Sequence, residues 1–212
     1  MDLKPICDAV LVGNAPKVKE FIQQAIDGGT EPQVVLQEAL IPAMAEVGRR
    51  MKVQEYYIPE VLIAARAMQG GLQLLKPVLA GGNVQPVSKI ALGTVKGDLH
   101  DIGKNLVGMM MEGAGFEVID LGTDVSPEKF VAAVREGGAN MIGMSALLTT
   151  TMPNIKKTID ALKEAGVREN VKVLVGGAPV TQRYADEIGA DSYALDASSA
   201  VDIAKAQVGV QV

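Results

Sequence analysis

The feature that most restricts the fold of this chain is a change of hydrophobic period close to residue 88. Beyond that point, short apolar runs alternate with longer stretches that space their apolar residues as a helix does. The apolar runs occupy residues 89–95, 116–122, 139–147, 171–177 and 191–195. Runs of this length and composition are typical of buried parallel strands. The alternation therefore predicts a doubly wound α/β domain with a five-stranded parallel sheet.

Each predicted strand is followed by a predicted helix, which is the connection that parallel strands require. The helices are expected at residues 102–115, from Ser126 onward, at 155–166, at 181–188 and from about Ala197. In a Rossmann- or flavodoxin-like sheet of this kind, ligands bind outside the carboxyl ends of the strands. The loops that are expected to carry function are therefore 95–103, 122–126, 145–153, 176–181 and 195–198.

The first part of the chain, residues 1–80, carries only the helical period and predicts a four-helix bundle. Thr30, as an N-cap, and Pro32, in the first turn, are typical of a helix start. Residues 81–88, GGNVQPVS, combine glycine, asparagine and proline without any period, as a linker does. We therefore expect a helical domain at 1–80, a hinge at 81–88 and an α/β domain at 89–212.

Composition and charge narrow the function classes. No apolar run in the 212 residues reaches the roughly 20 needed to cross a bilayer, and the N-terminus does not resemble a secretory signal. The formal net charge is −5, and Lys and Arg are scattered, which disfavours nucleic-acid binding. A single cysteine excludes an intrachain disulfide and is compatible with a reducing compartment. The sequence thus predicts a cytoplasmic protein that binds neither membranes nor nucleic acids.

His100, the only histidine of the chain, lies in the loop after the first predicted strand, in the segment VKGDLHDIGKN. Asp98 precedes it by two residues, close enough for its carboxylate to accept the Nδ1 proton and leave Nε2 as a basic lone pair. One His and one Cys do not make an ordinary transition-metal site. A single histidine suffices for a metal that arrives inside a macrocycle and needs an axial ligand. A surface or helix-capping histidine is the alternative.

Other loops at the same predicted edge carry small and polar residues. Ser145, Thr149 and Thr151 follow the third strand, and they either contact a ligand or cap the helix that begins near Pro153. The pair Gly176-Gly177 follows the fourth strand, where it either forms a tight turn or lets a bulky ligand approach the backbone. Their joint placement on one α/β half favours the ligand interpretation.

These residues resemble a known signature. Asp98-x-His100-x-x-Gly103, followed by Ser145-x-Leu147 and then Gly176-Gly177, is similar to the cobalamin-binding domains of the methionine-synthase type. The resemblance implies a cobalamin or related corrinoid bound base-off, with His100 as the axial ligand of cobalt. It implies Asp98 as the hydrogen-bond partner of His100 and Thr151, where a serine is usual, as the end of a proton relay.

The resemblance implies further cofactor contacts along the same loops. The residues expected to contact the corrinoid are Gly97, Asp98, Leu99, His100, Asp101, Ile102, Gly103, Ser145, Leu147, Thr149, Gly176, Gly177 and Ala197. The nucleotide tail is expected beside Gly103, Ser145 and the glycine pair, and Ala197 near its base. Asp101 either contacts the cofactor or caps the helix that starts at Ile102.

The stretch 43–68 resembles the helical cap of these proteins, with Met51 where an aromatic residue usually shields the methyl group and Ile58 at the second shielding position. These residues are lid residues or plain bundle core. The whole chain thus resembles the free-standing corrinoid proteins of methyltransferase systems. The resemblance implies a methyl carrier that alternates between cob(I)alamin and methylcob(III)alamin. It also implies a donor-specific methyltransferase, an acceptor methyltransferase using a thiol or tetrahydrofolate, and a reductive activation protein.

Four readings compete. A cobalamin-dependent sensor shares both halves but also needs a DNA-binding module, which these residues do not resemble. The small subunit of an adenosylcobalamin mutase shares the histidine signature but lacks the helical half. A phosphoacceptor domain would place a cluster of acids after the first strand and an aspartate at the end of the third, where Ser145 stands. A flavodoxin-like domain is the related alternative, which a red or orange rather than yellow or colourless protein would exclude. The methyl-carrier reading therefore leads, although the methyl donor (methanol, a methylamine, a betaine or a methoxyarene) stays open.

Overall fold

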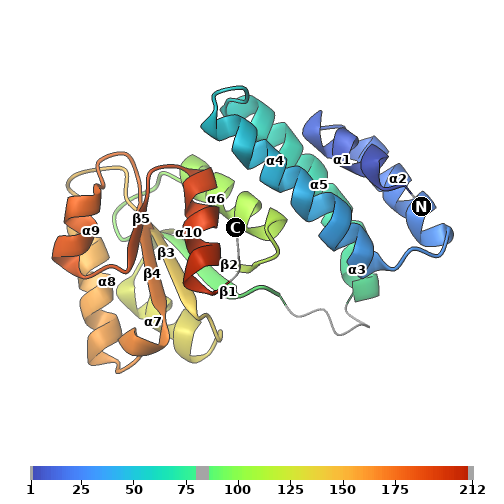
Figure 1. The fold of residues 1–212 in the computed structure, drawn as a ribbon. Coiled ribbons are helices and arrows are strands. Elements are labelled where there is room, and N and C mark those ends of the chain that lie inside the picture. Colours follow the sequence, from blue (N-terminus) through green and yellow to red (C-terminus); the bar gives the residue numbers. More distant parts are fainter. Residues whose placement is uncertain (1, 80–85, 210–212) are drawn as a thin grey trace. The chain divides into compact units, whose positions relative to one another are not determined.

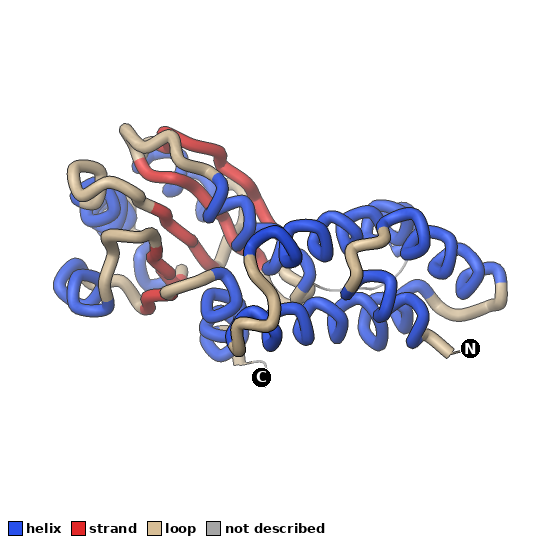
Figure 2. The backbone as a smooth tube through the Cα atoms, turned by 90° about the horizontal axis from the view of Figure 1, so that it is seen from above, coloured by secondary structure: helices blue, strands red, loops and turns tan. Residues whose placement is uncertain are grey.

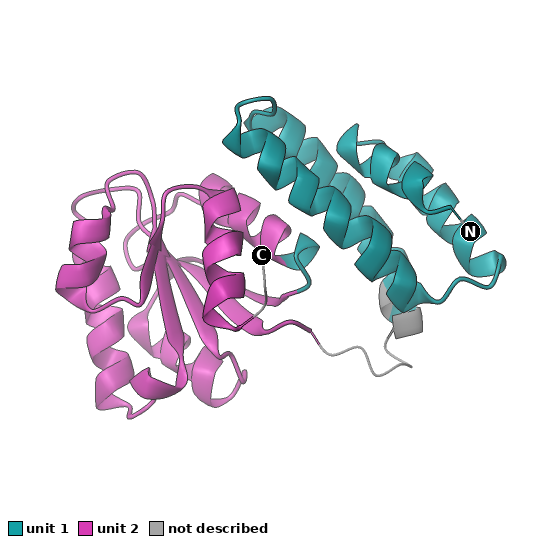
Figure 3. Ribbon diagram, in the orientation of Figure 1, with its two compact units in different colours: residues 1–85, 112–115 teal, residues 86–111, 116–212 magenta. Residues whose placement is uncertain are grey.

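The structure is a computed structural model of the chain, and it describes residues 2–79 and 86–209. Two compact units are distinguished, in different colours in Figure 3. The helical unit comprises residues 1–85 together with 112–115, and the α/β unit comprises residues 86–111 and 116–212. Within the predicted hinge 81–88, residues 81–85 lie outside the described residues.

The helical unit consists of consecutive helices. Their bounds are α1 Lys4–Leu11, α2 Ala15–Asp27, α3 Pro32–Val35, the π-helical turn η1 Leu36–Leu40, α4 Ile41–Lys52 and α5 Ile58–Leu79. The segments α3, η1 and α4 follow one another without a break, so they form one helix with a wide turn, as the single predicted helix requires. Glu31 rather than Thr30 occupies the N-cap of α3. The expectation that Thr30 caps this helix was therefore wrong by one residue.

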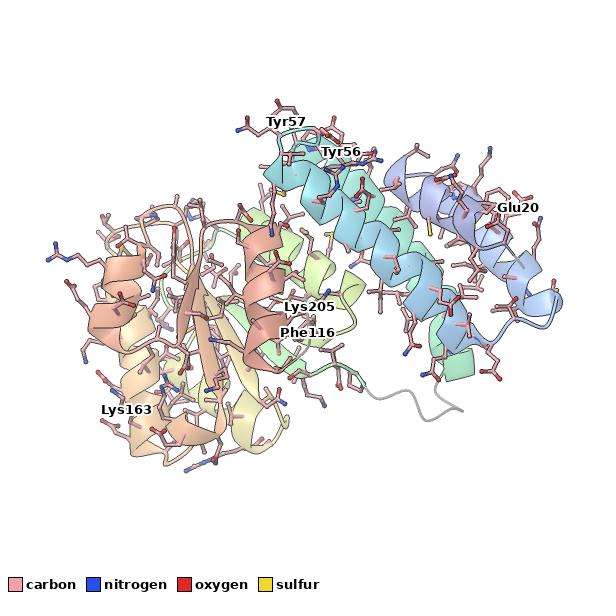
Figure 4. All side chains as sticks on the ribbon, viewed as in Figure 1. Glu20, Tyr56, Tyr57, Phe116, Lys163 and Lys205 are labelled. Atoms are coloured by element: carbon pink, nitrogen blue, oxygen red, sulfur yellow. The ribbon has the colours of Figure 1, made fainter. Side chains whose placement is uncertain are left out.

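Close packing and one polar contact hold the helical unit together. A Cβ atom at Gly71 of α5 would lie 2.8 Å from Ile22 Cδ1, so glycine allows α2 and α5 to approach closely. Tyr56, labelled in Figure 4, lies in the turn between α4 and α5. Its hydroxyl donates to the carbonyl of Leu11 (3.1 Å) and accepts from Arg50 (2.9 Å). This contact ties the turn to the end of α1.

The α/β unit alternates strands and helices, as predicted. The bounds are β1 Lys89–Val95, α6 Ile102–Gly113, β2 Glu117–Val125, α7 Pro127–Arg135, β3 Met141–Ser145, α8 Pro153–Glu164, η2 Arg168–Asn170, β4 Lys172–Gly176, α9 Gln182–Ile188, β5 Ser192–Ala194 and α10 Ala197–Gln207. The strands pair in parallel in the order β2-β1-β3-β4-β5. Figures 1 and 2 show this sheet with helices on both sides. The doubly wound five-stranded prediction is confirmed.

The two faces of the sheet pack differently. On one face α7, α8 and α9 share a buried core with the strands, in which Phe130 is fully buried. A Cβ at Gly93 would lie 2.7 Å from the Phe130 ring, so this glycine makes room for the ring. On the other face Leu92 lies over Gly143, where an added Cβ would come within 2.3 Å of it. Gly143 therefore makes room for Leu92 on this second face, which carries α6 and α10 (Figure 1).

Strand β2 is longer than predicted, because it extends to Val125 rather than to Gly122. Its pairing with β1 contains two register shifts, where β2 advances one residue more than β1. Gly122 (φ +84°) and Asp124 (φ +51°) adopt left-handed backbone conformations within this stretch. The carboxyl end of β2 is thus bulged, which bends the strand locally. Among the described helices, none is long and apolar enough to cross a membrane.

Candidate functional site

The carboxyl ends of the central strands bring three distant segments together. The parallel register places Thr94 of β1 opposite Ser145 of β3, and Ser145 opposite Gly176 of β4. The segments that follow these residues carry most of the predicted site. Loop 96–101, loop 146–152 and the Gly176-Gly177 pair are therefore neighbours in space, as ligand-binding loops of a parallel sheet are expected to be.

Asp98 is the centre of this arrangement, and its side chain is fully buried. Its Oδ1 atom accepts from the backbone N–H of His100 (3.1 Å) and lies 2.7 Å from His100 Nδ1. Its Oδ2 atom accepts from the N–H groups of Leu147 (2.8 Å) and Leu148 (3.3 Å) and from the hydroxyl of Thr151 (2.7 Å). One carboxylate thus joins the loops after β1 and β3.

The hydrogen bonds to Asp98 decide its charge. Burial acts to raise the pKa of the Asp98 carboxyl, but the hydrogen bonds from Thr151, Leu147 and His100 outweigh burial and hold the pKa well below its usual range. Asp98 is therefore ionised at neutral pH. An ionised acceptor 2.7 Å from Nδ1 favours the tautomer with the proton on Nδ1.

His100 itself stands at the surface of the loop. Its side chain is 51% exposed. Its backbone carbonyl accepts from the hydroxyl of Thr94 (2.8 Å), a fully buried residue at the end of β1. His100 is thus held at two points, its Nδ1 by Asp98 and its backbone carbonyl by Thr94. The arrangement leaves Nε2 as the nitrogen that can bind a ligand.

The Ser/Thr group after β3 divides into buried and exposed members. Thr151 is buried, and its hydroxyl contacts Asp98 and the carbonyl of Leu148 (2.9 Å). Ser145, the last residue of β3, is half-buried, and Thr149 is exposed in the loop. Asp98 therefore contacts both Thr151 and His100 and connects the two side chains.

The predicted glycines differ in the steric or backbone constraint at each position. Gly177 has φ +121°, and a Cβ there would lie 2.0 Å from the carbonyl oxygen of Ala146, so the two loops touch through their backbones. A Cβ at Gly176 would come 3.1 Å from the carbonyl of Ala194. Gly97 has φ +82°, which permits the turn after β1. Gly103 has nothing within 4 Å of an added Cβ, so its surroundings are open.

Large aliphatic side chains stand exposed at the same edge, on the loops and at the start of α6. They are Leu99 (74% exposed), Ile102 (71%), Leu147 (40%), Leu148 (43%) and Leu195 (79%). Leu99, Ile102 and Leu147 belong to the predicted contact set, whereas sequence reasoning missed Leu148 and Leu195. We call these five residues the aliphatic rim. Exposed apolar groups clustered at a strand-end site indicate an apolar ligand surface.

The remaining predicted residues lie in several places. Ala197 is buried at the start of α10, whose N-cap Asp196 accepts from the N–H of Ser199 (2.7 Å). Asp101 precedes α6, and its carboxylate accepts from the Asn105 side chain (3.0 Å). Met51 and Ile58 belong to the helical unit, Met51 half-buried near the end of α4 and Ile58 51% exposed at the start of α5.

The donor set fits a metal that needs one protein nitrogen. Among the described residues, no group of three or more His, Cys, Asp or Glu is placed to hold a metal ion. His100 nevertheless has the buried carboxylate partner that orients metal-binding histidines. The aliphatic rim and the open space at Gly103 suit a large, partly apolar macrocycle with a side arm. These residues therefore fit a corrinoid.

Comparison with known proteins agrees with this chemistry. A family model described as "B12 binding domain" matches residues 88–203, and a second model with the same description matches residues 3–76. A corrinoid protein of Desulfitobacterium hafniense (strain Y51) is 44% identical over 98% of this chain and 97% of its own length. Dimethylamine corrinoid protein 1 of Methanosarcina acetivorans is 44% identical over 96% of this chain and 95% of its own length.

Solved structures are similar over almost the whole chain. A cobalamin-binding protein of Desulfitobacterium hafniense DCB-2 superposes with a TM-score of 0.79 at 33% identity, covering 97% of this chain and 98% of that one. The methanol:cobalamin methyltransferase complex of Methanosarcina barkeri contains a chain that superposes with a TM-score of 0.89 at 31% identity, covering 99% of this chain and 80% of that one.

Proposed function

This chain belongs to the corrinoid proteins with B12-binding domains that serve methyltransferase systems, and from this premise we propose that His100 is the protein ligand of its cobalt. The corrinoid then binds base-off, with the imidazole in place of the nucleotide base. The cofactor supplies the chemistry, because its cobalt accepts and releases a methyl group. The chain supplies ligation, proton control and docking.

The observation that carries the proposal is the 2.7 Å contact between His100 Nδ1 and the buried Asp98 carboxylate. Because the Asp98 carboxylate accepts the hydrogen bond from Nδ1–H, Nε2 keeps the lone pair that would bind a metal. Thr151 completes a proposed relay His100–Asp98–Thr151, because its hydroxyl donates a hydrogen bond to the Asp98 carboxylate.

The predicted contact set has a division of labour under this proposal. The rim residues Leu99, Ile102 and Leu147 contact the macrocycle, and Gly97 and Asp101 lie in the same loop. The side arm and its base are contacted by the remaining residues of the set, which are Gly103, Ser145, Thr149, Gly176, Gly177 and Ala197. Under the same proposal, Met51 and Ile58 of a helical cap at 1–80 shield the methyl group held by a corrinoid domain at 89–212.

The partners are proposed from the relatives. A relative named as a dimethylamine corrinoid protein is 44% identical, and a structural neighbour lies in a complex with a methanol methyltransferase. We infer that this chain docks a donor-specific methyltransferase and passes the methyl group to a thiol or tetrahydrofolate methyltransferase, with a reductive activation protein. A methylamine methyltransferase is the first partner to test in a coupled methyl-transfer assay with purified proteins.

The ligation proposal is tested with His100→Ala. Wild type and variant are reconstituted with methylcobalamin, and their visible spectra are recorded at pH 7. We expect the variant to lose the spectrum of nitrogen-ligated cobalt and to recover it when free imidazole is added. A variant spectrum identical to that of wild type would refute ligation by His100. Circular dichroism of the two apoproteins controls for folding.

A further inference from the structure

The bulged carboxyl end of β2 carries two aspartates that the proposed mechanism does not use. Asp120 lies at the first register shift and Asp124 at the second. Bulges beside functional sites often redirect a side chain. Both carboxylates contact the segment between β1 and the first turn of α6, which contains His100.

Asp124 contacts the beginning of that segment. Its Oδ1 atom accepts from the backbone N–H of Gly97 (2.7 Å), and its own N–H donates to the carbonyl of Asp98 (3.0 Å). The ammonium group of Lys96 lies 3.8 Å from the same carboxylate. Asp124 therefore holds the peptide units on both sides of the Gly97 turn, directly before the residue that orients His100.

The backbone of Asp124 is unusual. It has φ +51°, a left-handed conformation that costs a non-glycine residue energy and that aspartate tolerates better than most. Residues kept in such conformations cluster at functional sites, where the surrounding structure over-determines them. Here the two hydrogen bonds to Gly97 and Asp98 are the contacts that this conformation makes possible.

Asp120 contacts the end of the segment. Its Oδ1 atom accepts from the N–H of Gly122 (2.9 Å) and from the ammonium of Lys104 in the first turn of α6. The Lys104 side chain is only 4% exposed, and Asp120 is the carboxylate that pairs with its ammonium group. A buried ammonium without a partner is costly, which fixes Lys104 against Asp120.

We propose that Asp124, with the Asp120–Lys104 pair, is a positioning residue that holds the His100 loop in the conformation that ligates cobalt. The inference rests on the proposed axial role of His100. The bulged end of β2 contacts both ends of segment 97–104, at the Gly97 N–H and at the Lys104 ammonium. In the middle of the segment, the Thr94 hydroxyl donates to the carbonyl of His100. The loop is thus ordered before the corrinoid binds, so binding does not have to pay for ordering it.

The test compares Asp124→Gly with Asp124→Asn. Glycine keeps the left-handed backbone but removes the acceptor for the Gly97 N–H, whereas asparagine keeps both the conformation and an acceptor oxygen. Gln54→Gly is the matched control, because Gln54 is the other described non-glycine residue with positive φ (59°). It reports how relief of a left-handed residue alone changes hydrogen exchange of the residues around it.

Two readouts are used. Hydrogen–deuterium exchange of the apoprotein reports the order of residues 96–104 without any cofactor. The visible spectrum of the methylcobalamin-loaded protein reports the ratio of His-ligated to unligated cobalt. For Asp124→Gly we expect three- to tenfold faster exchange in this segment and a ligation ratio lowered by about three- to tenfold, the scale of one hydrogen bond. Asp124→Asn should stay within about twofold of wild type.

The outcomes separate the two proposals. Unchanged exchange and unchanged ligation in Asp124→Gly would overturn the positioning role, as would an asparagine variant as impaired as the glycine variant. If His100→Ala keeps a wild-type spectrum, the proposed axial role of His100 is refuted instead. The exchange experiment on the apoprotein still tests the positioning role of Asp124 in that case. If Asp124→Gly does not fold, Lys104→Met decides. Faster exchange and weaker ligation in Lys104→Met support the positioning role of Asp124 and the Asp120–Lys104 pair, and wild-type values overturn it.

Discussion

Replacement of Asp98 by asparagine should weaken the fold and change the tautomer of His100 at the same time. The Oδ2 atom of Asp98 receives two backbone N–H groups and the Thr151 hydroxyl, whereas Oδ1 receives the N–H of His100 and faces Nδ1. An amide NH2 in the Oδ2 position would face two N–H donors. We therefore expect the amide to turn its NH2 toward His100, where it faces one N–H and can donate to Nδ1.

The magnitude follows from the same contacts. Loss of a charge-assisted acceptor costs about 1.5–3 kcal/mol, and one buried N–H left unpaired costs about 1–3 kcal/mol. Partial relaxation of the loop offsets some of this sum. We expect Asp98→Asn to lower the free energy of unfolding by about 2–4 kcal/mol at pH 7. A donor aimed at Nδ1 moves the imidazole proton to Nε2, so the variant should also lose axial ligation.

The pH dependence gives the prediction its sharpest test. Because the pKa of Asp98 is lowered in the folded protein, its contribution to stability is complete above the ordinary carboxyl pKa of about 3.9 and declines as pH falls below it. Asparagine does not titrate. The gap between wild type and variant should therefore shrink by about 1 kcal/mol between pH 7 and pH 3.

The assay is urea unfolding of the apoproteins at both pH values, read from hydrogen exchange of the β1 and β3 amides so that the α/β unit is followed alone. Asp160→Asn is a suitable control, because Asp160 forms exposed ion pairs on α8 and should change stability by at most about 0.5 kcal/mol. A gap below about 0.5 kcal/mol at pH 7, or one that widens on acidification, would refute this account of Asp98.

Three further predictions concern single contacts. Gly177→Ala should destabilise the α/β unit by more than about 3 kcal/mol, since the new methyl would lie 2.0 Å from the Ala146 carbonyl. Gly138→Ala, where φ is also positive (+68° against +121° at Gly177) but the surroundings are open, should cost only about 1 kcal/mol in the same thermal melts, and equal losses would contradict the steric explanation. Thr94→Val should cost about 1 kcal/mol and speed hydrogen exchange around His100, whereas Thr94→Ser should not, because serine keeps the hydroxyl that donates to the His100 carbonyl. Tyr56→Phe should lower the stability of the helical unit by about 1 kcal/mol, measured by exchange of α1 and α5 amides, because the hydroxyl bridges Arg50 and Leu11; an unchanged exchange rate would show that water replaces it.

The sheet was predictable because its central strands β1 and β3 are buried along almost their whole length and read as apolar runs. The carboxyl end of β2 was not, since Gly122-Thr123-Asp124 has the composition of a turn. In the structure a bulge lets these residues continue to pair with β1 as far as Val125. A bulge depends on hydrogen bonds to a neighbouring strand, which a single sequence does not display.

Asp98 and His100 were found as candidates because they are close in sequence and chemically unusual. Thr94 and Asp124 were missed for opposite reasons. Thr94 looks like an ordinary strand residue, and its hydroxyl partner is a backbone carbonyl that no residue pattern reveals. Asp124 falls in loop 122–126, which was expected at the functional edge, so an acidic residue there was the available signal.

The contacts of Asp98 also set an order of events during synthesis. Its loop partners Leu147, Leu148 and Thr151 follow it by 49, 50 and 53 residues. Contacts of such long sequence separation form late in folding. A nascent chain that has emerged only as far as α7 therefore exposes an Asp98 carboxylate that lacks three of its hydrogen-bond donors, in a loop not yet joined to the loop after β3. If His100 ligates cobalt as proposed, competence to hold the corrinoid appears only after β3 has joined β1, so the corrinoid is loaded after these two strands have paired.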